Sequence, residues 1–283
     1  MKNKVKEGII MSEKNKQEIL RLVDVHYQYD DGNVALSGIH AQFFNNEKVA
    51  VLGNNGAGKS TFFFLCNGVF PLSTGSIFLN DHLITNSKKD LNLLRQHIGL
   101  VFQDSDVQMI GSTVYEEIGF GPMNLGYSKE EVRRRVDEVV KNLELSDYVK
   151  RAPHCLSGGE KKRVCIGDAL VMEPQMLFFD EPTTGLDSKN IMLFEENLKS
   201  LENRGIGVVI ATHDVDFAWR FADRILIFHE GKILADGDPF DIFTNRKLLE
   251  KSGLIQPTLV QIGIKLGWKE IPKNLVEFQK MSL

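Results

Sequence analysis

Apolar and polar residues follow two different spacings along this chain, and each spacing predicts a type of element. In "LRLVDVHYQYDDGNVAL", from Leu20 to Leu36, they alternate as in half-buried strands, with "DDGN" as the turn. The apolar segment "EKVAVLG", residues 47–53, predicts a short buried strand, and a helix is expected from about Lys59 to Asn67.

Residues 128–145, "SKEEVRRRVDEVVKNLEL", have helical rather than strand spacing. Ser128 and Glu131 predict a capping box at the start of this helix. The "RRR" within it suggests nucleic acid at first sight, but on an amphipathic helix it is more typical of a solvated face. The positions expected to face the core are Val132, Val136, Val139 or Val140, and Leu143.

The second half of the chain contains two strongly apolar strands, "QMLFFDEP" and "GVVIATHD", separated by an acidic helix, and then a hairpin, "RILIFHEGKILADG". From about Thr244 the composition changes to that of a helical appendage. Alternating strands and helices predict a parallel sheet with helices on its faces. Polar residues follow three of these strands, and they should meet at the carboxyl ends of the sheet in one site.

Composition and charge narrow the function only slightly. The chain has 283 residues, of which 42% are hydrophobic and 25% charged, as in an ordinary globular protein. A net charge of -4 gives no reason to expect a nucleic acid or an anionic membrane surface as partner. The sequence shows no apolar run of about 18 residues. The charged first 17 residues predict a flexible tail without a signal peptide, with Met11 as an alternative start, so a membrane role would come through a partner.

Three cysteines, Cys66, Cys155 and Cys165, form no CxxC pair and leave one unmatched. We interpret them as reduced cytosolic thiols that serve as small apolar residues, against the alternative of a metal or redox role. No pair of histidines occurs in HExxH or a comparable cluster, so we assign no transition-metal ligand to this chain.

The segment "GNNGAGKS", Gly53 to Ser60, matches G-x-x-x-x-G-K-[ST] in full and lies between a predicted strand and a predicted helix. Its glycines let backbone N–H groups turn inward around a phosphate, and the helix N-terminus adds positive potential. Lys59 would provide a charge for the outer phosphates and Ser60 a hydroxyl for Mg²⁺. These residues predict a nucleoside-triphosphate site.

Other strand ends supply the remaining chemistry of such a site. Asp180 is placed to hold Mg²⁺ through water, and Glu181 to orient and deprotonate the attacking water. His213 is expected to hydrogen-bond the γ-phosphate, and Gln103 to complete the Mg²⁺ and water shell. Taken alone, each has a plain alternative: a surface Asp-Glu pair, an ordinary polar histidine, a loop glutamine.

A second glycine-rich stretch, "LSGGEKKRV", opens another helix at Leu156. A capping box between Ser157 and Glu160 explains those two residues. It does not explain two consecutive glycines, which make sense if the backbone approaches something closely.

Together these motifs closely resemble the ATP-binding-cassette (ABC) ATPases over about residues 20 to 243. "GNNGAGKS" looks like the Walker A loop, "MLFFDE" like Walker B, Gln103 like the Q-loop glutamine and "LSGGE" like the family signature. "GLD", ending at Asp187, resembles the D-loop, and His213 the switch histidine. The resemblance implies a P-loop NTPase fold with a RecA-like parallel core, an N-terminal antiparallel β subdomain, a helical signature subdomain at about 104–172 and a C-terminal helical extension at 244–283.

In that family the signature loop closes over the ATP of a second subunit, which implies a head-to-tail dimer with two ATP molecules sandwiched. Tyr29 resembles the aromatic residue that stacks on adenine, and we prefer it to Tyr27 because of its distance from "DDG". The implied ATP-binding residues are Tyr29, Gly53, Asn54, Asn55, Gly56, Ala57, Gly58, Lys59, Ser60 and Thr61. The implied signature residues are Ser157, Gly158, Gly159 and Glu160, and those for Mg²⁺ are Ser60, Gln103 and Asp180.

Two positions depart from the common family pattern. Asn54 stands where proline is common, and Glu160 where glutamine is common. Neither removes a catalytic position, so we expect hydrolysis at both sites of a homodimer.

"FQDSDVQMIGSTVYEEIGFGPMNLGYS" is similar to importers of the energy-coupling-factor type, and "THDVDFAWRFADRILIF" looks most like their cobalt and nickel members. That resemblance implies membrane coupling and substrate-binding partners, a peripheral place at the cytoplasmic face of the cell membrane, and docking of a coupling helix between Gln103 and Ser157. A vitamin importer of the same type is the same-fold alternative. A soluble cassette ATPase of iron–sulfur assembly or DNA repair is the alternative from another class. The short Gln103–Ser157 spacing disfavours repair, and "GPMNLG" disfavours assembly.

Overall fold

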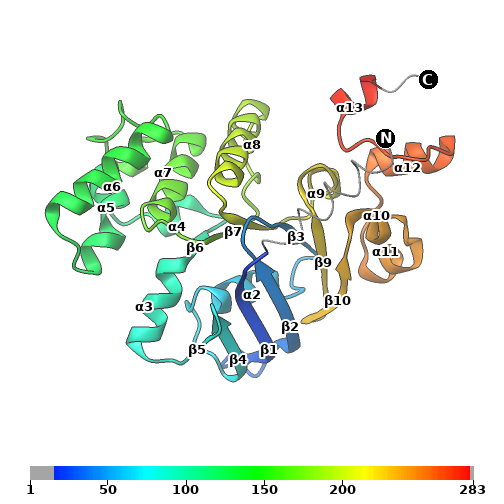
Figure 1. Ribbon diagram of the computed structural model, residues 1–283, viewed down its shortest axis with the longest axis horizontal. Helices are drawn as coiled ribbons and strands as arrows, with labels where there is room; N and C mark the ends of the chain where they lie inside the picture. Colours follow the sequence, from blue (N-terminus) through cyan, green and yellow to red (C-terminus); the bar gives the residue numbers. More distant parts are fainter. Residues whose placement is uncertain (1–15, 281–283) are drawn as a thin grey trace.

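The computed structural model describes residues 16–280, and its core is two sheets joined by helices (Figure 1). The predicted flexible tail, residues 1 to about 17, therefore lies almost wholly outside the described residues. Within the described part of the chain, no helix combines the length and apolarity needed to cross a membrane.

The first sheet is antiparallel and has the strand order β2-β1-β4-β5. The predicted alternating segment forms β1 (Glu18–Gln28) and β2 (Val34–Phe44), while β4 (Thr74–Leu79) and β5 (His82–Ile84) complete the sheet. The predicted turn closes with Tyr29 N donating to Asn33 O at 2.9 Å. This sheet places Tyr29, just beyond the end of β1, in the wall of the cavity that residues 55–61 also line.

The second sheet has the order β10-β9-β3-β8-β7-β6. Its strands are β3 (Lys48–Leu52), β6 (Ile98–Val101), β7 (Met176–Asp180), β8 (Gly207–Ala211), β9 (Arg224–His229) and β10 (Lys232–Gly237). Every neighbouring pair is parallel except the predicted hairpin β9–β10. Because β6, β7 and β8 are buried throughout, they appear in the sequence as continuous apolar runs rather than alternating ones.

Helices cover both faces of this second sheet. The predicted helix after the phosphate loop is α2 (Lys59–Cys66), and α3 (Lys88–His97) leads directly into β6. On the other side lie α8 (Ser188–Asn203) and α9 (Val215–Phe221). The P-loop ATPase fold expected from the sequence is thus confirmed.

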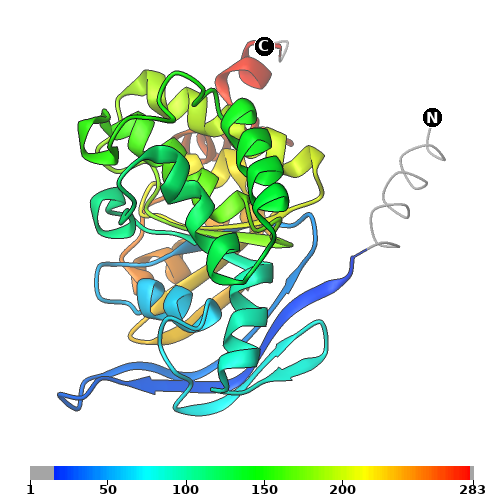
Figure 2. The ribbon, with the colours of Figure 1, turned by 90° about the vertical axis from the view of Figure 1, so that its left-hand side faces the viewer.

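Between β6 and β7 the chain forms a helical segment, which faces the viewer in Figure 2. It contains α4 (Ser105–Gln108), α5 (Val114–Asn124), α6 (Lys129–Asn142), the 3₁₀ turn η1 (Pro153–Cys155) and α7 (Gly158–Leu170). The expected core positions of the amphipathic helix are buried, at 6% exposure or less, and both alternatives, Val139 and Val140, face the core.

Two details of α6 differ from the expectation. Ser128 accepts a hydrogen bond from Glu131 N, but the Glu131 carboxylate binds Arg134 and Arg135 instead of completing a capping box. The "RRR" face is also not uniformly solvated. Arg135 is folded back over the Tyr127 ring, and its guanidinium donates to Val171 O, so this arginine fixes α6 to the end of α7.

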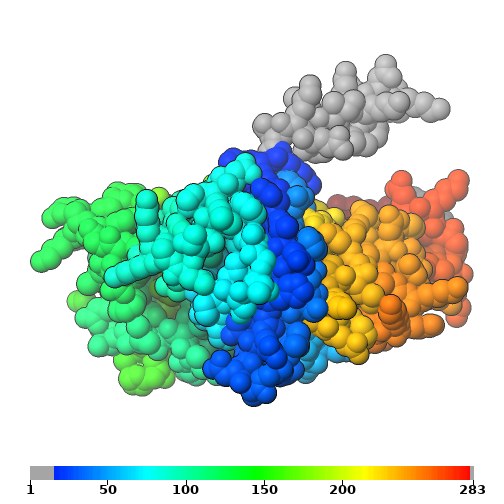
Figure 3. Space-filling model, turned by 90° about the horizontal axis from the view of Figure 1, so that it is seen from below, coloured from blue at the N-terminus to red at the C-terminus, as the bar shows by residue number. Residues whose placement is uncertain are grey.

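The chain ends in α10 (Pro239–Thr244), α11 (Arg246–Ser252), α12 (Thr258–Leu266) and α13 (Leu275–Lys280). These helices and the α4–α7 segment lie at opposite ends of the molecule, with the sheets between them (Figures 1 and 3). Leu249 and Val260 pack in one cluster with Ala50 and Leu52 of β3, so the C-terminal helices contact the strand that leads into the phosphate loop.

Candidate ATP site

The phosphate loop runs from the end of β3 to the start of α2 and is held open by its own backbone. Ala57 N donates to Asn54 O, and Lys59 Nζ donates to Gly53 O at 2.7 Å and to Asn54 O at 3.3 Å. Gly58 has φ 104°, a conformation that residues with a side chain rarely adopt. It also lies against Ala35 of β2, which leaves no room for a Cβ. The loop thereby places its N–H groups and Lys59 around one cavity.

Lys59 is 6% exposed, and burial lowers its pKa, an effect opposed by the carboxylates of Glu181 and Asp180. Within residues 16–280 its ammonium group donates to these two loop carbonyls. A phosphate that enters the loop would replace those carbonyls with a charged acceptor, which makes a stronger hydrogen bond.

Asp180 ends β7 and Glu181 follows it with φ 44°, a left-handed conformation that is uncommon for a residue other than glycine. Glu181 thus lies just beyond the end of the strand. Glu181 N donates to Ala211 O of β8 at 2.9 Å, which holds the turn in place. Strained backbone conformations of this kind persist only where the surrounding structure holds them, and they cluster at functional sites.

His213 follows β8, and its Nδ1 lies 2.9 Å from Glu181 Oε2. Burial raises the pKa of Glu181, and the neighbouring His213 and Lys59 oppose that increase. Two adjoining cavities, of about 270 and 640 Å³, share Asn55, Gln103 and Glu181 in their walls. The smaller is lined by the loop and Asp180, and the larger by His213, so the three strand ends do form one site.

Tyr29 lines the smaller cavity beside the loop, and its hydroxyl lies 2.7 Å from Thr61 Oγ1. Tyr27 instead stacks on Phe70, with ring centroids 5.1 Å apart and planes 5° apart. Of the two tyrosines considered for the adenine, Tyr29 is therefore the one beside the phosphate loop, while Tyr27 is occupied within the protein.

The second glycine-rich stretch lies outside this site. Ser157 and Glu160 form the predicted capping box at the start of α7, and no residue of 157–160 lines either cavity of the described chain. Gly159 is pressed against the Asn190 side chain, which hydrogen-bonds Asp187 at the start of α8. A Cβ on Gly158 would meet nothing within 4 Å. Gly159 thus allows a close contact within the chain, whereas Gly158 lies beside open space.

Asp180 provides the test of whether these residues suit Mg²⁺. Its Oδ1 is buried without a hydrogen-bond partner, and burial raises its pKa, with Ser60 and Lys59 opposing the increase. A buried carboxylate oxygen without a partner costs free energy unless a cation or donor reaches it. Asp180 and Ser60 offer the oxygen ligands that Mg²⁺ prefers, so they fit this ion.

Comparison with known proteins decides the family. Residues 36–184 match the family model described as ABC transporter, which is more than half of the chain. This chain belongs to the ABC transporter ATPases. Its relatives place it with the energy-coupling-factor members. It is 39% identical to the energy-coupling factor transporter ATP-binding protein EcfA of Methanococcus maripaludis, over 93% of this chain and 99% of that protein. It is 42% identical to EcfA of Methanothermobacter thermautotrophicus, over 84% and 77%.

Solved structures agree with this ABC ATPase fold. CbiO1 from Clostridium perfringens, described as part of the ABC transporter complex cbiONQ, superposes with a TM-score of 0.73 and 37% identity, over 89% of this chain and 99% of that one. The ATP-binding cassette MJ0796, in a dimeric post-hydrolysis state bound to ADP and Pi, gives 0.69 and 30%, over 78% and 99%. The chain is accordingly an ATPase of the kind that hydrolyses ATP in transporters.

Sequence reasoning missed two neighbours of the residues that line the candidate site. The turn after α11, residues 253–255, lines the larger cavity, and Gly253 lies against the side chain of Asn54. Lys162 of α7 is buried and donates to the backbone of the Gln103 segment. Both contacts join segments far apart in sequence, and no local pattern indicates them.

Proposed function

We propose that this chain is the ATP-hydrolysing subunit of an energy-coupling-factor importer for cobalt or nickel ions, and that it works as a head-to-tail homodimer. The observation that carries the mechanism is a division within one chain: the residues suited to ATP hydrolysis share one site, while the signature loop faces elsewhere. A second subunit would supply the missing half of each site.

ATP binding begins at the phosphate loop in this proposal. Lys59 exchanges the carbonyls of Gly53 and Asn54 for the outer phosphates, and the loop N–H groups and the α2 N-terminus hold the others. Tyr29 lies where a base attached to those phosphates would stack. Mg²⁺, held by Asp180 and Ser60 with Gln103 nearby, would neutralise phosphate charge as it develops.

Hydrolysis then depends on Glu181. Its carboxylate accepts the proton of the attacking water, and His213 holds the carboxylate in position through the bond from Nδ1. Because Glu181 is 8% exposed, its proton affinity is higher than that of a surface glutamate, which suits a general base. Ser157 of the second subunit would close over the γ-phosphate with its neighbours Gly158 and Gly159.

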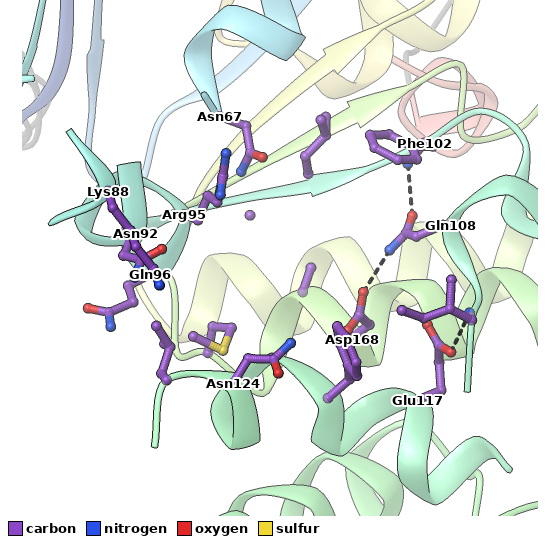
Figure 4. A pocket seen from close by; sticks show the side chains of 18 residues that line it. Asn67, Lys88, Asn92, Arg95, Gln96, Phe102, Gln108, Glu117, Asn124 and Asp168 are labelled. Atoms are coloured by element: carbon purple, nitrogen blue, oxygen red, sulfur yellow. Dashed lines mark hydrogen bonds between the residues drawn. The ribbon is translucent and has the colours of Figure 1, made fainter. Parts of the chain in front are cut away.

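A groove of about 630 Å³ beside α7 is where we place the membrane partner's coupling helix (Figure 4). Lys88, Asn92 and Arg95 of α3 line one side, and Asn124 of α5 and Met172 line the other. At its floor Gln108 bridges Phe102 and Asp168, directly beyond Gln103. A helix seated there would contact residues that are hydrogen-bonded to the segment carrying Gln103, and this continuity supports a coupling role for the groove.

Cobalt or nickel is proposed on the resemblance of "THDVDFAWRFADRILIF" and "LSGGEKKRV" to the members that transport these ions. Purification of the tagged chain from its native membranes in mild detergent tests this. Membrane proteins of cobalt or nickel uptake should copurify. A vitamin-binding membrane protein would overturn the ion while keeping the mechanism, and soluble partners alone would overturn the importer.

The mechanism has its own test. Glu181→Gln should retain ATP and elute as a dimer in size-exclusion chromatography with ATP and Mg²⁺, and as a monomer without ATP. If this variant hydrolysed ATP at the rate of the unaltered chain, the assigned mechanism would be wrong.

A further inference from the structure

Lys162 is a buried lysine on α7 whose bonds go to another segment. It is 4% exposed, and its Nζ donates to Phe102 O at 2.9 Å and to Gln103 O at 3.0 Å. Among residues 16–280 no carboxylate lies within ion-pair distance of it. An ammonium group taken out of water without a counter-ion is costly, so its two carbonyl acceptors are the compensation.

Other bonds tie the same segment to α7. Phe102 N donates to Gln108 Oε1 at 3.0 Å, and Gln108 Nε2 donates to Asp168 Oδ2 at 3.1 Å (Figure 4). Lys161 Nζ forms an ion pair with Asp106 at 2.6 Å. Gln103 itself is exposed and lines both cavities of the candidate ATP site. Lys162 is the residue of α7 that bonds directly to its backbone.

Lys162 lies about one and a half helical turns after Ser157, on the same helix. The start of α7 therefore carries the residues proposed to meet the partner's ATP, and its second turn holds the backbone of the residue proposed to act on the chain's own ATP. Because α7 is one continuous helix, a displacement of its start would be transmitted to Lys162.

We propose that Lys162 is a positioning residue for Gln103, through which the signature end of α7 controls hydrolysis at the ATP site of its own subunit. The inference rests on the proposed head-to-tail dimer. It predicts that hydrolysis at the two ATP sites is coupled through each chain, because a displacement of α7 on the partner's ATP carries Gln103 with it.

Lys162→Met tests this in the full-length chain, because methionine fills a similar volume but leaves both carbonyls without their donor. We expect kcat for ATP hydrolysis to fall several-fold, while KM for ATP stays close to that of the unaltered chain. Gln103→Ala should lower kcat similarly, and Gln103→Ala/Lys162→Met should be no slower than Gln103→Ala alone. Lys129→Met is the matched control, since Lys129 is an exposed lysine of the same helical segment.

The outcomes separate this inference from the proposed function. If Lys162→Met keeps full kcat, or adds its whole effect to that of Gln103→Ala, the positioning role is wrong. If Gln103→Ala has no effect on hydrolysis, the proposed role of Gln103 fails first. Should Lys162→Met fold poorly by thermal melting, Lys162→Leu also lacks a donor for these carbonyls and gives the same comparison.

Discussion

His213 Nδ1 lies 2.9 Å from Glu181 Oε2, and this bond joins the ends of the neighbouring strands β7 and β8. The two partners differ in exposure, with side chains that are 69% and 10% exposed respectively. The exposed histidine thus fixes the orientation of a buried carboxylate in the wall of the larger cavity.

Glu181→Gln should reduce ATP hydrolysis by about 10²-fold or more, since general-base catalysis contributes about that much. ATP affinity should persist, because the loop and Lys59 are unchanged. Phosphate release and equilibrium binding of a fluorescent ATP analogue measure the two properties. Glu196→Gln, an exposed residue of α8, serves as control and should leave both unchanged.

His213→Ala should move the acid limb of the kcat–pH profile to higher pH. Burial raises the pKa of Glu181 and His213 opposes this, so loss of the imidazole raises the pKa further. A base with a higher pKa is protonated at higher pH, and activity is lost sooner on acidification. An acid limb that moves to lower pH, or stays in place, would contradict the assignment of Glu181 as base.

Gly159→Ala should be less stable than Gly158→Ala by about 1 kcal/mol, the net contribution of one hydrogen bond. The new Cβ would collide with Asn190 and disturb its bond to Asp187. Gly158→Ala is the matched control, since its Cβ meets nothing within 4 Å. Equal unfolding midpoints in urea for the two variants would show that Asn190 does not constrain Gly159.

Asp168→Asn should stabilise the protein at pH 8 and do so less at pH 5. Burial raises the pKa of Asp168 to about 7, against its ordinary 3.8. The folded state therefore holds the proton between these values, and stability falls as pH rises through this window. We expect Asp168→Asn to raise the free energy of unfolding by about 1 kcal/mol at pH 8. This is less than the full pKa shift would give, because Asp168 lines a groove. Urea unfolding at both pH values measures the difference.

Much of the fold follows from local sequence. The period of two in β1 and β2, the apolar runs of β7 and β8 and the spacing of valines in α6 each specify an element. The glycine loop, "DE" and His213 each follow a predicted strand of the parallel sheet, which likewise places them at one end of that sheet. Local patterns carry this information because each element must bury its own apolar face.

Other features depend on contacts between distant segments. Phe70, for example, stacks on Tyr27 and contacts the Tyr29 ring edge-on. The positive φ of Glu181 comes from its bond to Ala211, and the role of Lys162 from the path of residues 102–103. None of these has a periodic signal, so packing in three dimensions is needed to find them.

The central claim is that the signature loop of one chain completes the ATP site of another, and complementation between two inactive variants tests it most directly. Lys59→Ala removes the phosphate-binding lysine, and Ser157→Arg blocks the signature loop. A mixed dimer then contains one site with both Lys59 and Ser157 intact. We predict that mixing restores ATP hydrolysis that neither variant shows alone. If mixed dimers, verified with two different affinity tags, remain as inactive as each variant while the unaltered chain is active, the signature loop does not act across subunits.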